Sequence, residues 1–192
     1  MTTTLFLPAL AALGLSACSL GGKAPDLFLT LTPESTVAAS AGTTSSADNA
    51  ITVVAPTLPQ ALDTTRIPVR TGPTSLAYLK NAFWVDTPDN LFQRLLSETI
   101  SARTGRTVLD PLQFSFNPGN RLTGQLQNFG LDADRMEVVV TYDAALARGP
   151  ESVTTRRFEA RVPVAAADRN LVAPALNQAA NQVAAEVAAW IG

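Results

Sequence analysis

Histidine is absent from the 192-residue chain, and lysine occurs only at Lys23 and Lys80. Without an imidazole there is no histidine general base, no Ser-His-Asp triad and no imidazole metal ligand. Neither lysine stands three residues after a serine, as a Ser-x-x-Lys hydrolase requires. The nucleotide-binding motifs G-x-x-x-x-G-K-[ST] and G-x-G-x-x-G are missing as well. These absences exclude most enzyme classes and an ATPase subunit.

Charge is also scarce, because Asp, Glu, Lys and Arg make up only 16% of the chain and leave a net charge of −2. Proteins that bind a phosphate backbone carry a basic face or stripe, so we expect no nucleic-acid partner. Asp132-x-Asp134 starts like a calcium loop, but Met136 and Glu137 occupy the next ligand and turn-glycine positions. We interpret it as a polar turn. A glycosidase needs only two carboxylates, yet the scattered acids single out no pair.

Cysteine occurs once, directly after an uncharged apolar segment. Leu5 to Leu15 fits the ~7–15 residues of a signal-peptide core and falls short of the ~20 that span a bilayer as a helix. Leu15-Ser16-Ala17-Cys18 resembles the lipobox of bacterial lipoproteins. We therefore predict a signal peptide over residues 1–17 and covalent diacylglycerol on the Cys18 thiol.

Lipidation would make Cys18 the mature N-terminus, where a second acylation of the α-amino group gives stable membrane anchoring. A buried free cysteine is the alternative, but it does not explain the position after the apolar segment. With Cys18 consumed, disulfides, thiolate catalysis and cysteine-based zinc sites are excluded too. We expect no cofactor, no metal and no enzymatic activity.

The rest of the chain has room for one domain. Residues 18–26 form a short tether containing Gly and Pro, and residues 27–192 form the domain. Within it, the Ser-, Thr- and Ala-rich residues 34–49 predict a flexible loop. Short strands are expected at 27–31, 51–54 and 66–70, and a hairpin joins 76–79 to 82–85.

Two amphipathic helices are expected. The first begins after Thr87 with Pro88 at its first position and ends before Gly105, with an apolar stripe through Leu91 and Leu95. The second begins near Asn170 and tolerates Pro174 as part of its first turn. The alanines of this helix permit close packing.

The second half of the chain also alternates with a period of two. Residues 121–129, 136–146 and 153–164 predict an antiparallel meander with one dry and one wet face. The prediction is an α+β fold: a two-layer domain with a mainly antiparallel, mixed sheet and both helices on its dry face.

A set of short motifs follows the lipobox in a fixed order: Leu58-Pro59, Leu62-Asp63, Arg66-Ile67, Val69-Arg70, Leu76-Ala77-Tyr78 and Phe83-Trp84-Val85-Asp86. In this order they resemble the ABC-type transport auxiliary lipoprotein family, which includes the paraquat-inducible lipoprotein of MCE-type lipid transport systems. The resemblance extends over nearly the whole mature chain.

The resemblance implies a non-enzymatic, lipid-anchored accessory subunit of an envelope lipid transporter. Its implied partners are an MCE-domain protein and the ABC permease and ATPase subunits. Ser19 follows Cys18 where aspartate commonly retains lipoproteins in the inner membrane, so the periplasmic face of the outer membrane is favoured. Self-association stays open. The alternative function is a carrier that shields an acyl chain in an apolar cavity.

Arg66, Arg70 and Trp84 are candidate interface residues, because Arg and Trp are enriched in interface hot spots. The favoured alternative is structural: Trp84 packs under the start of the first helix, and an arginine pairs with Asp86 or Asp63. Phe114 and Phe116 could form an apolar contact loop. The favoured alternative for them is a buried hairpin arm.

Overall fold

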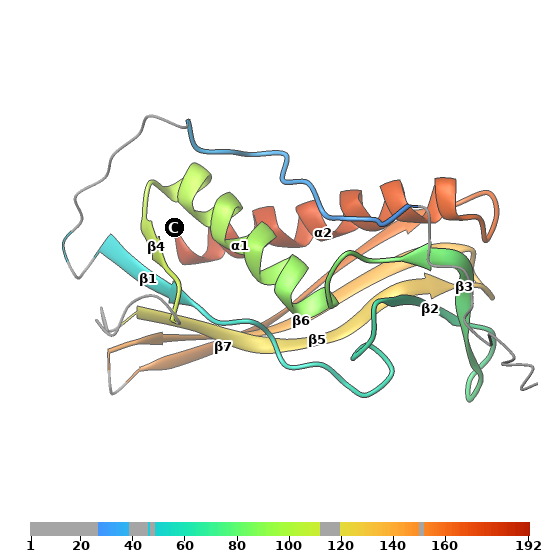
Figure 1. The fold of residues 1–192 in the computed structure, drawn as a ribbon. Helices are drawn as coiled ribbons and strands as arrows, with labels where there is room; N and C mark the ends of the chain where they lie inside the picture. The colour runs from blue at the N-terminus through green and yellow to red at the C-terminus, as the bar shows by residue number, and fades with distance from the viewer. Residues whose placement is uncertain (1–26, 39–45, 47–48, 112–119, 150–151) are drawn as a thin grey trace, which may run out of the picture.

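The computed structural model describes residues 27–38, 46, 49–111, 120–149 and 152–192. Within these ranges the chain forms one mixed sheet of seven strands and two helices. Figure 1 shows the helices α1 (Pro88–Thr104) and α2 (Arg169–Ile191) on the same face of the sheet. The predicted two-layer α+β fold is confirmed.

Strand β5 (Asn120–Asp132) organises the sheet. One edge pairs along its whole length with antiparallel β6 (Glu137–Arg148), which in turn pairs with β7 (Val153–Pro163). This is the expected meander. The other edge of β5 pairs in parallel with β1 (Ala50–Val53) near its start and with β2 (Arg66–Arg70) at its end. The two halves of that edge are therefore occupied by different strands.

The outer strands on that side differ from the expectation. Leu76–Phe83 is one strand, β3, which pairs antiparallel with β2, so the predicted hairpin of 76–79 with 82–85 is wrong. Asn81 adopts a positive φ of 53°, but the chain does not turn back there. The register of β2 and β3 instead shifts, as in a β-bulge, between the pairs made by Arg66 and Pro68. The short strand β4 (Thr107–Leu109), parallel to β1, was not predicted.

The expected strand over residues 27–31 is reduced to a single bridge between Leu29 and Trp84. From there the chain crosses the helices in an extended path. The Thr32 N–H donates to the Asn177 Oδ1 at 2.7 Å, and the Glu34 N–H to the Asn181 Oδ1 at 2.8 Å. The Asn181 Nδ2 returns a bond to the Thr32 carbonyl at 2.9 Å. Residues 39–45 and 47–48 of the predicted flexible loop lie outside the described residues.

The predicted ends of α1 are confirmed. Pro88 is its first residue, and Gly105 ends it in the left-handed conformation at φ 68°. Its buried face carries Leu91, Phe92 and Leu95 as the spacing predicted. Helix α2 begins one residue earlier than expected, with the Asp168 side chain accepting from the Asn170 N–H at 2.8 Å.

Pro174 is the sixth residue of α2. The prediction that it belongs to the first turn, where backbone N–H groups have no partner inside the helix, is therefore wrong. The ring removes one donor inside the helix, and the packing of the helix on the sheet offsets that loss.

Aromatic pairs join the two layers. The rings of Phe92 in α1 and Tyr142 in β6 meet edge-on at 5.3 Å, and those of Phe158 in β7 and Trp190 in α2 at 5.6 Å. Each fully buried large apolar side chain contributes roughly 1.5–3 kcal/mol to folding. The alanines of α2 that face the core let the helix approach the sheet closely.

Candidate functional site

Trp84 belongs to the core and is not available to a partner. Its side chain is 1% exposed, and its ring lies 5.6 Å from that of Phe129. This burial agrees with a structural role for Trp84, and the ring that it contacts is Phe129 of β5. Asp86 pairs at 2.9 Å with Arg94, an arginine of α1. The expected partners were Arg66 and Arg70.

Arg66 and Arg70 are exposed at the two ends of β2. The Arg66 guanidinium lies over the Tyr78 ring, 4.5 Å from its centre. The Tyr78 hydroxyl donates to the Ala61 carbonyl at 3.3 Å. Arg66 thus covers a ring that holds the loop between β1 and β2, and its charge remains open to solvent.

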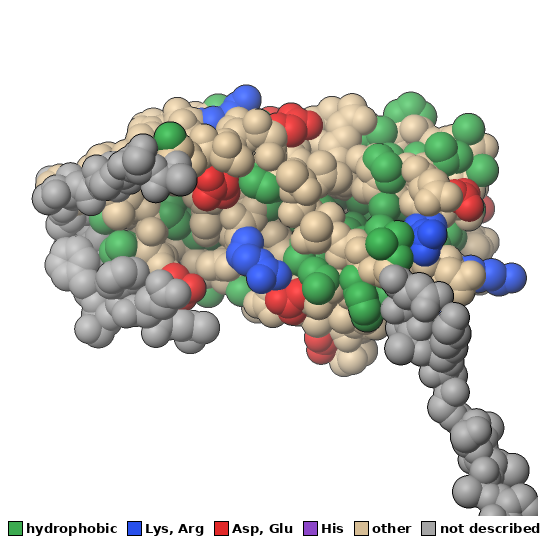
Figure 2. Space-filling model, turned by 45° about the horizontal axis from the view of Figure 1, so that its top comes forward, with side chains coloured by type: hydrophobic (Ala, Val, Ile, Leu, Met, Phe, Trp, Pro, Cys, Tyr) green, Lys and Arg blue, Asp and Glu red, His purple; other side chains and the backbone are tan. Residues whose placement is uncertain are grey.

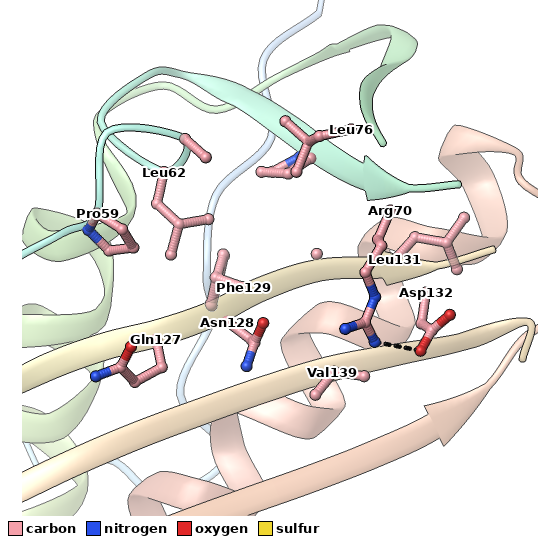
Figure 3. Close-up of a pocket in the computed structure, with 13 residues that line it drawn as sticks. Pro59, Leu62, Arg70, Leu76, Gln127, Asn128, Phe129, Leu131, Asp132 and Val139 are labelled. Carbon is pink, nitrogen blue, oxygen red and sulfur yellow. Dashed lines mark hydrogen bonds and ion pairs between the residues drawn. The ribbon is translucent and has the colours of Figure 1, made fainter. Parts of the chain in front are cut away.

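A small hollow of about 110 Å³ lies in the fork where β2 and β5 separate (Figure 3). Its wall combines Pro59, Leu62, Leu76, Gln127, Phe129 and Val139. Gly130 is required at this fork: a Cβ there would lie 2.4 Å from the Pro68 carbonyl oxygen. The close approach of the two backbones therefore depends on the missing side chain.

Arg70 and Asp132 close one end of the hollow with an ion pair (Figure 3). Burial would raise the pKa of the Asp132 carboxyl, but the hydrogen bond and charge of Arg70 and backbone donors outweigh it and hold the pKa below the usual 3.8. One of those donors is the Arg135 N–H, at 3.4 Å. The polar turn predicted at Asp132-x-Asp134 is present, but Asp132 is buried and pairs with Arg70.

The sheet face opposite the helices carries two rows of polar side chains across β5, β6 and β7, which we call the outer polar face. In one row Arg157 binds both oxygens of Asp143 at 2.6 and 2.7 Å, and Gln127 donates to Asp143 at 3.0 Å. In the other, Thr141 donates to Glu159 at 2.8 Å, and Arg161 donates to the same carboxylate at 2.8 Å.

The carboxylates of these clusters are all held in their charged form. The pKa of Asp143 is lowered, mainly by the hydrogen bond from Arg157. Burial alone would raise the pKa of Glu159, but Thr141 and Arg161 lower it overall. A general acid needs a raised pKa, so these groups are suited to binding charge and not to proton donation. The hydrolase interpretation gains no support from them.

A wider groove of about 680 Å³ runs beside α1. Leu31, Leu91 and Leu95 line it together with the charged Arg94 and Glu98. The Glu98 Oε1 also accepts from the Val37 N–H at 2.8 Å, which ties the N-terminal segment to α1. An open groove with charged walls is suited to a polar partner segment more than to an acyl chain.

The remaining predicted site residues, Cys18, Phe114 and Phe116, lie outside the described residues. Across the ranges the structure describes, no cluster of three or more acidic or cysteine ligands could hold a metal ion. Among the same residues, no helix is long and apolar enough to cross a membrane.

Sequence reasoning missed two features of these sites. The pairing of Arg70 with Asp132 joins residues 62 positions apart, and no local pattern signals it. Asn181 stands on the alanine-rich buried face of α2. A buried polar side chain needs hydrogen-bond partners, so an asparagine at an apolar position was the available sign that it binds backbone.

The fold is that of a small α+β domain, and comparisons with known proteins identify its family. The model of the family described as ABC-type transport auxiliary lipoprotein component matches residues 29–188. The chain therefore belongs to this family. No curated protein matches the chain.

Solved structures share the fold. A protein of the DUF330 family from Xanthomonas campestris superposes with a TM-score of 0.64 at 20% identity, over 87% of this chain and 92% of its own. An uncharacterised protein superposes with a TM-score of 0.65 at 15% identity, over 86% of this chain and 100% of its own.

Proposed function

We propose that the chain is a non-enzymatic accessory subunit of an ABC/MCE-type envelope lipid transport system. It is held by lipid on Cys18 at the periplasmic face of the outer membrane, where it docks the assembly. The observation that carries the proposal is the family match over residues 29–188, which begins shortly behind the lipobox-like Leu15–Cys18.

The chemistry of the described surface supports a binding role. The chain has no histidine, and the ion-paired carboxylates Asp132, Asp143 and Glu159 have lowered pKa values. Arg66 is exposed, and its guanidinium lies over the Tyr78 ring. An arginine stacked in this way is pre-organised to bind a carboxylate of a partner.

The test is capture of the native complex. Cells carrying a photoreactive amino acid in place of Arg66 are irradiated, and the tagged chain is isolated from the solubilised envelope. We expect crosslinked MCE protein or transporter subunits. The matched control places the same amino acid at Gln178, which is exposed on α2. Recovery of no transporter component in any irradiated envelope sample would contradict the proposal.

The carrier alternative makes a different prediction for the same purified material. A carrier retains stoichiometric phospholipid, which mass spectrometry of the extract detects, and a docking subunit does not. The charged groove beside α1 does not favour a carrier.

A further inference from the structure

Large apolar side chains are exposed where the described chain begins. Leu27, Phe28 and Val85 are 53%, 52% and 58% exposed. The Val85 N–H donates to the Leu29 carbonyl at 2.8 Å, and Leu29 pairs with Trp84. Since Trp84 points into the core, Phe28 and Val85 point outward by strand alternation. We call Leu27, Phe28 and Val85 the anchor-end patch.

Cationic side chains border this patch. Leu27 lines a hollow together with Arg169, and Arg169 lines the adjoining hollow together with Lys80. The Arg169 Nη1 donates to the Asn81 carbonyl at 3.2 Å, which fixes the guanidinium beside β3. Figure 2 shows hydrophobic and cationic side chains near the grey tail at lower right.

Among the charged side chains that line these two hollows, cations outnumber acids. The acid in these two hollows is Asp168, against the cations Lys80 and Arg169. A local positive charge in a chain of net charge −2 complements an anionic lipid surface.

The sequence distance to the lipid supports the same partner. Residues 18–26 separate Cys18 from the patch, and at ~3.3–3.6 Å per residue they span at most about 30 Å. If Cys18 carries lipid, as the proposed function requires, this end of the domain stays close to the bilayer. Exposed apolar groups flanked by cations bind at the headgroup boundary of such a surface.

We propose that the anchor-end patch contacts the membrane. Phe28 and Val85 enter the headgroup layer, while Lys80 and Arg169 face lipid phosphates. The domain then rests on the bilayer by its tethered end and points the far end, where Val153 is 66% exposed, toward the periplasm. This inference rests on the proposed lipid anchoring.

The test uses the full lipidated chain in vesicles of phosphatidylethanolamine and phosphatidylglycerol. Because Cys18 is the one native cysteine and carries the lipid, a thiol-reactive fluorophore labels only an introduced cysteine. The variants are Phe28→Cys and Val85→Cys, with Val153→Cys as the matched control. We expect quenching by aqueous acrylamide to be about threefold weaker at positions 28 and 85 than at 153, as for side chains at the headgroup boundary.

Vesicle flotation separates the two proposals. A chain that does not float with the vesicles contradicts the lipid anchor and the patch together. A chain that floats, but whose labels at 28 and 85 are quenched as strongly as the label at 153, contradicts the patch alone. Lys80→Glu in the Phe28→Cys background is expected to weaken the protection, and the same loss in vesicles without phosphatidylglycerol supports the charge contribution.

Discussion

At the scale of single residues, the fork between β2 and β5 concentrates the constraints. Gly130 lets the strands approach, and Asp132 satisfies Arg70 and backbone donors in a buried position. Both residues make their contacts inside the fold. Substitutions there should therefore change stability before they change binding.

Gly130→Ala is expected to lower the free energy of unfolding by about 2–3 kcal/mol, because the new Cβ overpacks the Pro68 carbonyl. Gly105→Ala is the matched control. Its Cβ would meet nothing within 4 Å, so only the left-handed backbone conformation is strained, at a cost of about 1 kcal/mol. Urea unfolding followed by circular dichroism measures both. Equal losses in the two variants would contradict the close approach at Gly130.

Asp132→Asn is expected to destabilise the domain by about 1–2 kcal/mol near pH 7, since the half-exposed Arg70 is partly screened by solvent. The folded-state pKa of Asp132 is lowered, so its stabilisation is present above the unfolded value and is lost as pH falls through the folded value. The difference between wild type and variant should therefore shrink on acidification below the ordinary 3.8.

Asp134→Asn is the control for this substitution, because Asp134 is exposed in the same turn. It should change stability by less than about 0.5 kcal/mol at either pH. A difference between wild type and Asp132→Asn that stays constant from neutral to acid pH would contradict the ion-pair assignment.

At the scale of elements, the N-terminal segment connects the tether to both helices. It has one bridge to the sheet edge, Leu29 and Leu31 pack against the core, and side chains of α1 and α2 hold its backbone by hydrogen bonds. A segment held by a few side chains opens more readily than a strand in the sheet. Asn181 is the key residue, because its side chain both donates to and accepts from this segment.

Asn181→Ala is expected to release the segment while leaving the sheet intact. Amide hydrogen exchange at Thr32 and Glu34 should accelerate by about tenfold or more, and exchange along β5 should not change. Gln178→Ala, at an exposed position of the same helix, should leave both unchanged. Unaltered protection at Thr32 and Glu34 in the Asn181 variant would show that other contacts hold the segment.

At the scale of the whole molecule, the end of the domain at Leu27 differs from the sheet face opposite the helices. The end that begins at Leu27 exposes apolar and cationic groups, whereas the face of the sheet opposite the helices is covered by paired charges. Such a distribution suits a domain with a fixed orientation to a surface. The proposed lipid on Cys18 would supply that orientation.

A Cys18→Ala precursor is expected to fold normally yet to leave the membrane fraction and fail to complement a deletion strain. The reason is that the family match and the core lie downstream of residue 18. Unfolding transitions and envelope fractionation measure the two effects. Ser19→Asp is the matched variant, which should keep the lipid but shift the chain to the inner membrane. Full complementation by the Cys18→Ala chain would contradict a need for the tether.

Periodic patterns in the sequence determined the elements that bury one face. The meander β5–β6–β7, the α+β class and helix α1 followed from spacing and from the residue types at the helix ends, because these are local requirements. The predicted lipid site at Cys18 also depends on a local motif, and it stays a prediction.

The tertiary structure decided what depends on distant neighbours. The parallel pairing of β1 and β2 along one edge of β5 joins segments separated by α1, and a strand pattern does not specify its partner. The same holds for Trp84: its residue type left an interface role open beside the favoured structural one, and burial against Phe129 made it core. Which apolar side chains stay exposed beside Leu27 could be seen only once the fold had buried the others.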